Sequence, residues 1–130
     1  MIKYSFITCM LVVSASSSIL ADSVKRPLPV SITINPASFI SVSGTVSNNK
    51  FILNWTVGNN QTADQFEIEK STDGVTFTMA ALVFGTDKDS DDSYQFYEKA
   101  VAKKTFYRIK VINKNKSVGY SKLIEINPVS

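Results

Sequence analysis

The sequence predicts an all-β protein of the antiparallel sandwich class, and three observations carry that prediction. No helical period of apolar residues appears in residues 22–130, where β-branched and aromatic side chains dominate. Runs in which apolar and polar residues alternate recur along this part of the chain, as expected of half-buried strands. Turn sequences separate the runs at roughly 8–12-residue spacing, which is typical of sandwiches. We therefore expect one domain of about seven strands.

The first 21 residues are predicted to be a secretory signal peptide. Lys3 supplies the positive charge, residues 6–13 (FITCMLVV) form a short apolar run, and a stretch of small residues leads to Ala21 as the cleavage point. The apolar run is shorter than the roughly 20 residues that a membrane-spanning helix needs. We expect an exported protein of the periplasm, the cell surface or the extracellular space, without a membrane span.

The composition of the remaining chain excludes several classes of chemistry. The single cysteine, Cys9, lies within the signal peptide, and the chain has no histidine, so the exported domain is disulfide-free. Catalysis by a Ser-His or Cys-His pair and zinc sites built on His or Cys are therefore excluded. Without Lys3, 13 basic and 11 acidic side chains remain, and a net charge of +2 is too small and dispersed to predict a nucleic-acid partner.

The strands can be placed in order along the chain. Three prolines predict an extended lead-in over residues 22–36, with an edge strand at residues 29–34. Gly74 lies in a tight turn at the position that requires positive φ, and Asn48 or Asn49 does so in an earlier turn. The expected strands are residues 39–46, 51–57, 65–71, 75–84, 93–98, 105–112 and 117–126.

Alternation within these strands assigns one side of each to the core and the other to solvent. Glu67, Glu69, Arg108 and Lys110 are expected to point outward. The side chains expected to point inward are Phe51, Leu53, Trp55, Val57, Phe66, Ile68, Phe77, Tyr94, Phe96, Tyr107, Ile109 and Val111.

Five segments together resemble a known family. They are LNWTV (53–57), FEIEKSTDGVTF (66–77), YQFYE (94–98), FYRIKVINKN (106–115) and GYSKLIEI (119–126). Their order resembles the fibronectin type III-like module of exported bacterial proteins, above all in Gram-negative bacteria that use a type IX, C-terminal-sorting secretion route. The likeness covers roughly residues 28–126, and the domain itself is expected over residues 37–127.

The resemblance implies an immunoglobulin-like sandwich and three structural hallmark residues. Trp55 matches the core tryptophan of the second strand, Tyr107 matches the tyrosine corner with Val101 at its apolar position, and Gly74 matches the hairpin turn. Residues 33–42 are longer than usual for such modules, which predicts a break or a change of sheet in the first strand. In longer relatives a sorting domain commonly follows the last strand. The printed sequence stops at NPVS soon after that strand, so we expect either a free-standing module or a shortened relative.

Two groups of carboxylates are candidate sites. Glu67 and Glu69 share one strand face, and a separation of about 7 Å between their Cα atoms does not exclude a glycosidase pair. In the sandwich that the resemblance implies, however, they face Arg108 and Lys110, which favours a ladder of opposite charges. A D-x-D-x-D loop, with Asp87, Asp89 and Asp91, fits the first half of a calcium loop.

The calcium loop is incomplete in sequence. No glycine stands at its sixth position, and the acid at its twelfth, Glu98, falls at the end of a predicted strand. A solvated acidic loop is the competing interpretation. Calcium is the one cofactor that the sequence leaves open.

The sequence thus predicts a non-enzymatic module for binding, adhesion or spacing, with a protein or glycan partner. The expected recognition surfaces are the polar loops at 58–64, 85–92 and 113–117. The alternative is a small carbohydrate-binding accessory protein that uses exposed aromatic side chains. The aromatic candidates for that role are Tyr94, Phe96, Tyr97, Phe106 and Tyr120; by alternation most point inward, and Tyr97 and Phe106 are the exceptions.

Overall fold

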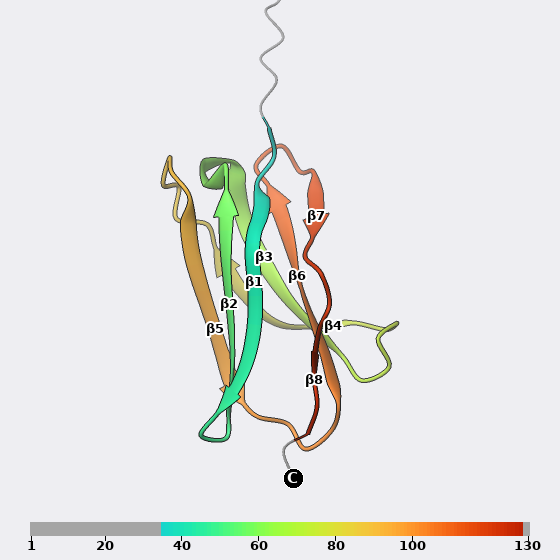
Figure 1. Ribbon diagram of the computed structural model, residues 1–130. Coiled ribbons are helices and arrows are strands. Elements are labelled where there is room, and N and C mark those ends of the chain that lie inside the picture. The colour runs from blue at the N-terminus through green and yellow to red at the C-terminus, as the bar shows by residue number, and fades with distance from the viewer. Residues whose placement is uncertain (1–34, 129–130) are drawn as a thin grey trace, which may run out of the picture. The chain divides into compact units, whose positions relative to one another are not determined.

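The computed structural model describes residues 35–128. The signal peptide at 1–21 and the edge strand expected at 29–34 lie outside the described residues. Within residues 35–128, two antiparallel β-sheets pack face to face, as Figure 1 shows. The all-β sandwich that the sequence predicts is confirmed.

One sheet has three strands in the order β1-β2-β5. They are β1 (Ser38–Ser47), β2 (Lys50–Gly58) and β5 (Asp92–Lys99). The other sheet has five strands, in the order β4-β3-β6-β7, with β8 paired to a further part of β6. They are β3 (Ala63–Ser71), β4 (Thr78–Phe84), β6 (Thr105–Asn113), β7 (Val118–Tyr120) and β8 (Ile124–Ile126).

The last predicted strand, residues 117–126, is in fact two strands, so the described residues contain eight strands where about seven were expected. Ser121 explains the interruption. Its backbone N–H donates to the carbonyl of Ile109 at 2.8 Å, and its hydroxyl oxygen accepts from the backbone N–H of Ile109 at 2.8 Å. A side-chain oxygen thus takes the place of a ladder carbonyl, and the chain leaves the regular strand path.

The turn after β3 is longer than the sequence predicts. Asp73 Oδ1 accepts hydrogen bonds from the backbone N–H groups of Val75 and Thr76, both at 2.8 Å. Gly74 has the positive φ that was expected, 75°. Because this turn occupies residues 72–77, β4 begins only at Thr78 and not at residue 75.

The expectation that Phe77 faces the core is wrong for the same reason. Phe77 lies in the turn and outside the core cluster, and its ring lies 3.9 Å from the guanidinium of Arg108 on the outer side of the sheet. The register between β3 and β4 also shifts between Ile68 and Glu69, which resets the alternation of β4.

Aromatic side chains from both sheets form the centre of the core. Trp55 stacks on Tyr94 with ring centroids 5.5 Å apart, and Phe66 of the opposite sheet contacts both rings. Closer to the turn between β1 and β2, Phe51 stacks on Tyr107 with ring centroids 4.1 Å apart. These contacts join the sheets through large apolar areas, as in sandwiches generally.

The break or change of sheet expected in the first strand does not occur over residues 38–47, where β1 stays in one sheet and contains only a β-bulge. Phe39 pairs with Val57 and Ser41 pairs with Thr56, so Ile40 has no partner residue on β2. The bulge leaves the Ile40 side chain exposed. Among residues 35–128, no helix has the length and apolar character required to cross a membrane.

Candidate functional site

The three loops expected to recognise a partner meet at one end of the sandwich. They are residues 58–62 between β2 and β3, 85–91 between β4 and β5, and 113–117 between β6 and β7, and we call them together the loop end. Two contacts of Lys114 bind the three loops together. Its backbone N–H donates to the carbonyl of Thr62 at 2.9 Å, and its ammonium lies 2.6 Å from Asp87 Oδ1.

A fully buried Asn60 fixes the loop at 85–91 from below. Its amide Nδ2 donates to Thr86 Oγ1 and to the carbonyl of Lys88, each at 3.0 Å, and its Oδ1 accepts from the Tyr94 hydroxyl. Thr86 Oγ1 in turn donates to Asp92 at 2.5 Å, and this bond lowers the pKa of the Asp92 carboxyl. Every polar atom of the Asn60 side chain therefore has a hydrogen-bond partner, so its burial leaves no polar group unsatisfied.

Asn113 has the corresponding role for the loop at 113–117. Its Oδ1 accepts from the backbone N–H of Ala37 at 3.1 Å, and its Nδ2 donates to the carbonyl of Ser117 at 3.2 Å. Beside it, a groove of about 600 Å³ is lined by residues that include Pro36, Gln61 and Asn115. The burial of both asparagines does not follow from the sequence, because Asn in a polar loop sequence is indistinguishable from an exposed turn residue.

The acidic loop does not gather its carboxylates. Asp87, Asp89 and Asp91 are exposed, and the Asp87 carboxylate is paired with Lys114. Across residues 35–128, no group of three or more metal-binding side chains is placed to hold an ion. Glu98, the acid at the twelfth position, instead contacts Tyr107 and Lys70 of the other sheet. The calcium site stays a prediction that rests on sequence spacing.

Glu98 forms a polar link with Tyr107, the residue expected to form a tyrosine corner, and this link is to a side chain and not to the backbone. The Tyr107 hydroxyl donates to Glu98 Oε1 at 2.5 Å, and Lys70 lies 3.5 Å from the second carboxylate oxygen. Burial first, and then the bond to Glu98, raise the pKa of Tyr107 far above its usual value. Tyr107 and Trp55 are both buried, and neither side chain is presented to a partner.

The outer face of the five-stranded sheet carries the charge ladder that the sequence predicts. Glu69 pairs with Arg108 at 2.7 Å, and Glu67 pairs with Lys110 at 3.4 Å. These residues are direct partners in the register of β3 and β6. Each glutamate is therefore held by a cation on the neighbouring strand, in the arrangement of a structural ladder.

Apolar side chains flank this ladder on both sides. Arg108 lies 3.9 Å from the centre of the Phe77 ring and 4.6 Å from that of Tyr120, so two aromatic rings and one carboxylate hold its guanidinium. Tyr120 is 52% exposed, and the expectation that it points inward is wrong. We call this surface the charged face; its members are Glu67, Glu69, Met79, Leu82, Phe84, Arg108, Lys110, Val118 and Tyr120.

The outer face of the three-stranded sheet has different chemistry. Gln95 Nε2 donates to Asn54 Oδ1 at 2.9 Å, and the hydroxyls of Thr56 and Ser93 lie 2.8 Å apart. We call this surface the hydroxyl face; its members are Ser41, Ser43, Thr45, Asn54, Thr56, Ser93 and Gln95, none of which carries a charge.

The aromatic side chains considered for sugar stacking do not form one platform. Tyr94 is buried, and Phe96 packs against the core. Tyr97 is 60% exposed at one end of the hydroxyl face, where the Lys50 ammonium lies 4.7 Å from its ring centre. Phe106 is half-buried and belongs to β6 of the other sheet. The two aromatics expected to be exposed thus lie on opposite sides of the sandwich.

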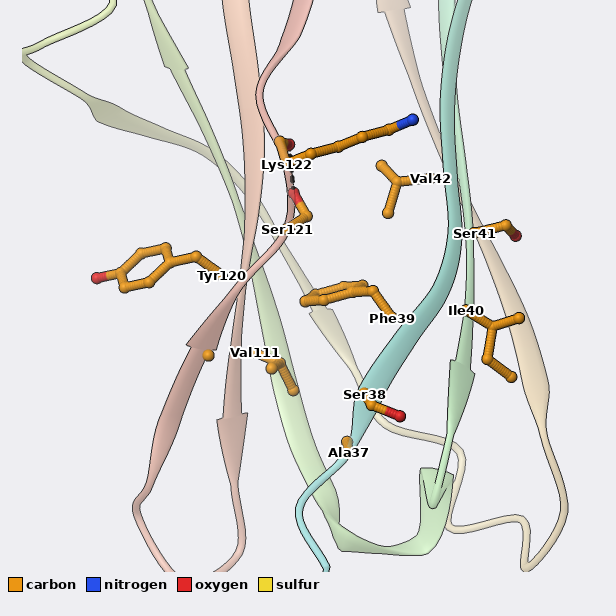
Figure 2. Close-up of a pocket in the computed structure, with 11 residues that line it drawn as sticks. Ala37, Ser38, Phe39, Ile40, Ser41, Val42, Val111, Tyr120, Ser121 and Lys122 are labelled. Atoms are coloured by element: carbon orange, nitrogen blue, oxygen red, sulfur yellow. Dashed lines mark hydrogen bonds between the residues drawn. The ribbon is translucent and has the colours of Figure 1, made fainter.

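A lateral groove opens between the free edges of β1 and β7, as Figure 2 shows. Its volume is about 490 Å³, and Phe39, Val42 and Ser121 line it. Tyr120 points away from the groove (Figure 2). The bulge at Ile40 and the interruption at Ser121 border this opening, and neither its position nor its size follows from strand alternation alone.

Comparisons with known proteins add little to this geometry. No protein-family model matches the chain, and no curated protein matches it. Among solved structures, the chain is similar to a beta-1,2-glucanase from Parabacteroides distasonis, at 14% identity with a TM-score of 0.47. The likeness covers 74% of this chain but only 14% of the glucanase chain. A similarity of this size carries no argument about function.

Proposed function

We propose that this chain is an exported, non-enzymatic recognition module of the fibronectin type III-like kind, and that its loop end binds a partner protein. The observation that carries the proposal is the joining of three separate loops into one surface. Lys114 contacts both other loops, and the buried Asn60 holds the loop at 85–91. A surface ordered before binding loses less conformational entropy when it binds.

The strand order supports the resemblance on which the module class rests. In immunoglobulin-like sandwiches the first, second and fifth strands share one sheet, and the third, sixth and seventh share the other. Strands β1, β2 and β5 follow the first pattern, and β3, β6 and β7 follow the second. Fibronectin type III domains share this architecture.

The proposed lack of enzymatic activity is supported by the state of the candidate acids. Glu67 and Glu69 each hold a cation on the neighbouring strand, so neither is a free acid or nucleophile facing the other. Export is supported by the predicted signal peptide. If residues 1–21 are removed during secretion, N-terminal sequencing of the secreted protein will begin at Asp22; an intact Met1 would contradict export by this route.

The loop end can be tested by reversing one charge there. We expect labelled protein to bind saturably to the surface of the cells that produce it, and Lys114→Glu to weaken binding by roughly tenfold or more, as for a central interface residue. Lys103→Glu is the matched control, since it makes the same change at an exposed position in the 99–105 corner. Equal binding by both variants would rule out the loop end as the recognition surface.

One observation favours a second function, carbohydrate binding. Tyr97 is an exposed aromatic ring beside a face of hydroxyl and amide groups, the combination that stacks on and hydrogen-bonds to sugars. On a glycan array, Tyr97→Ala should then abolish binding, whereas Phe106→Ala, on the other sheet, should not. Retained glycan binding by Tyr97→Ala would remove this alternative.

A further inference from the structure

The side chains of the charged face form four columns, one on each of four neighbouring strands. Apolar side chains of β4 form the first column, glutamates of β3 the second, Arg108 and Lys110 of β6 the third, and apolar side chains of β7 the fourth. Read from either side, an apolar column is followed by a charged one. The two charged columns have opposite signs.

The strand registers align these columns into rows. Leu82 lies beside Glu67, Glu67 beside Lys110, and Lys110 beside Tyr120. In the next row, toward the loop end, Phe84 lies beside Gln65 on one side and Val118 lies beside Ile112 on the other. Both of these rows therefore begin and end with an exposed apolar side chain. The third row, Met79 beside Glu69 and Glu69 beside Arg108, has no β7 residue at its far end.

This order makes the face complementary to itself. A two-fold axis that runs along the strands, between β3 and β6, exchanges β3 with β6 and β4 with β7. We propose that a second copy of this chain packs on the charged face about that axis. The glutamates of one copy then lie over the basic side chains of the other, and Leu82 lies over the partner copy's Tyr120 position.

The charges select this axis over the alternative. A two-fold axis across the strands would place β3 over β3, and the Glu67 and Glu69 carboxylates of the two copies would oppose each other. Like charges brought together in an interface are strongly unfavourable. The axis along the strands is thus the one for which both charge and apolar character match.

The apolar content of the face supports a protein occupant. Of the nine large apolar side chains that are exposed in residues 35–128, five belong to the charged face. Phe84, at 69%, is among the most exposed. Aromatic residues, Met and Arg are the types enriched in protein interfaces. Arg108 is already held between Phe77 and Tyr120, so little side-chain entropy is lost when it is covered.

The size of the face predicts a weak, reversible dimer. Four strands about 4.8 Å apart and rows about 7 Å apart give a patch of roughly 15–20 Å on each side. Such a patch is smaller than the roughly 800 Å² per partner of a standard interface, as in weak, transient complexes. Each charge keeps its partner within the sheet, so no buried ion is left alone when the copies meet.

The axis has a consequence for the loop end. Because it runs along the strands, both loop ends of the dimer lie on the same side. If the loop end binds a partner as proposed above, the dimer is bivalent, and neighbouring sites on one surface would be bound more tightly than single ones. The dimer itself is measured without any partner, so its test stands apart from the test of loop-end binding.

Sedimentation equilibrium of the purified secreted protein tests the dimer directly. We expect the average mass to rise with concentration toward twice the monomer mass, and Leu82→Glu to weaken the dimer by at least tenfold. Thr45→Glu is the control, since it places the same charge on the exposed hydroxyl face. A protein that stays monomeric at every concentration, or equal loss by both variants, would overturn the proposal.

A charge exchange keeps the test informative even if Leu82→Glu disturbs folding. The double variant Glu67→Lys, Lys110→Glu retains the pair within the sheet and the match between two identical copies. A mixed dimer with the wild type would oppose two lysines and also two glutamates. We expect each protein to dimerise alone and the mixed dimer to form at least tenfold less than random mixing predicts. Random mixing of two folded dimers would refute the arrangement.

Discussion

The two outer faces of the sandwich differ although the strands beneath them follow the same rule. The central strand of each sheet, β2 in one and β6 in the other, alternates between buried inward residues and less buried outward ones. On the charged face, long side chains such as Arg108 order one another through ion pairs and ring contacts. On the hydroxyl face, short side chains such as Thr56 and Ser93 make local hydrogen bonds only.

This difference indicates on which face the outward side chains contribute to the stability of the fold and on which face they do not. Exposed ion pairs typically contribute little, but a guanidinium held by a carboxylate and two rings is partly buried and shielded from solvent. The hydroxyl face has no such network. Substitutions on the two faces should therefore affect stability differently, and both should affect it less than substitutions in the shared core.

The largest expected effect comes from the core below the faces. Phe66→Ala removes a fully buried ring that contacts Trp55 and Tyr94, and should lower the free energy of unfolding by about 3–5 kcal/mol. Phe84→Ala removes the same side chain from an exposed position of the neighbouring strand and should change it by less than about 0.5 kcal/mol in dilute protein. Urea unfolding measures both; similar losses would mean that Phe84 is part of the core.

A smaller difference in the free energy of unfolding should distinguish substitutions on the two faces. Arg108→Ala removes one ion pair and two ring contacts and should cost about 1–2 kcal/mol. Gln95→Ala on the hydroxyl face removes one exposed hydrogen bond and should cost less than about 0.5 kcal/mol. If the two variants unfold at the same urea concentration, the charged face is no more ordered than the hydroxyl face.

The smallest effect concerns the turn that leads from β3 to β4 beside the charged face. Hydrogen bonds from the backbone N–H groups of Thr76 and Val75, and from Ser71, lower the pKa of Asp73 to about 2. Because the folded-state pKa is below the usual value of about 4, the contribution of this carboxylate is present above pH 4 and disappears as pH falls toward 2.

Asp73→Asn should remove that pH dependence. Thermal unfolding of wild type and variant between pH 5 and pH 2 should show the wild type losing slightly more stability than the variant over this window. Parallel curves would indicate that the turn bonds are not sensitive to protonation of Asp73.

Much of the fold was predictable because strand alternation is a local property. The inward positions of Phe51, Leu53 and Trp55 follow from a side-chain period of two, and the buried residues of β6 follow in the same way. The pairing of Glu67 with Lys110 was predictable once the resemblance supplied the neighbouring strand. The positive φ of Gly74 follows from its place in a tight turn.

The failed predictions share a different cause. Alternation places Phe77 in a strand, but the hydrogen bonds of Asp73 extend the turn past it. One regular strand over residues 117–126 would place Tyr120 inside, but the Ser121 contact with Ile109 breaks that strand. In both cases a side-chain hydrogen bond overrides the local period, and such a bond depends on a neighbour that the pattern does not identify.

The sequence by itself therefore determined the class of the fold, the extent of most strands and which side chains enter the core. Only the tertiary structure decided that three loops meet at one end, that Asn60 and Asn113 are buried, and that the four columns of the charged face stand in a self-complementary order. The physical reason is the separation along the chain over which each interaction acts. Alternation acts between neighbours in the chain, whereas a loop cluster and a column order arise from strands paired 20 or more residues apart, as Glu69 with Arg108 at a separation of 39.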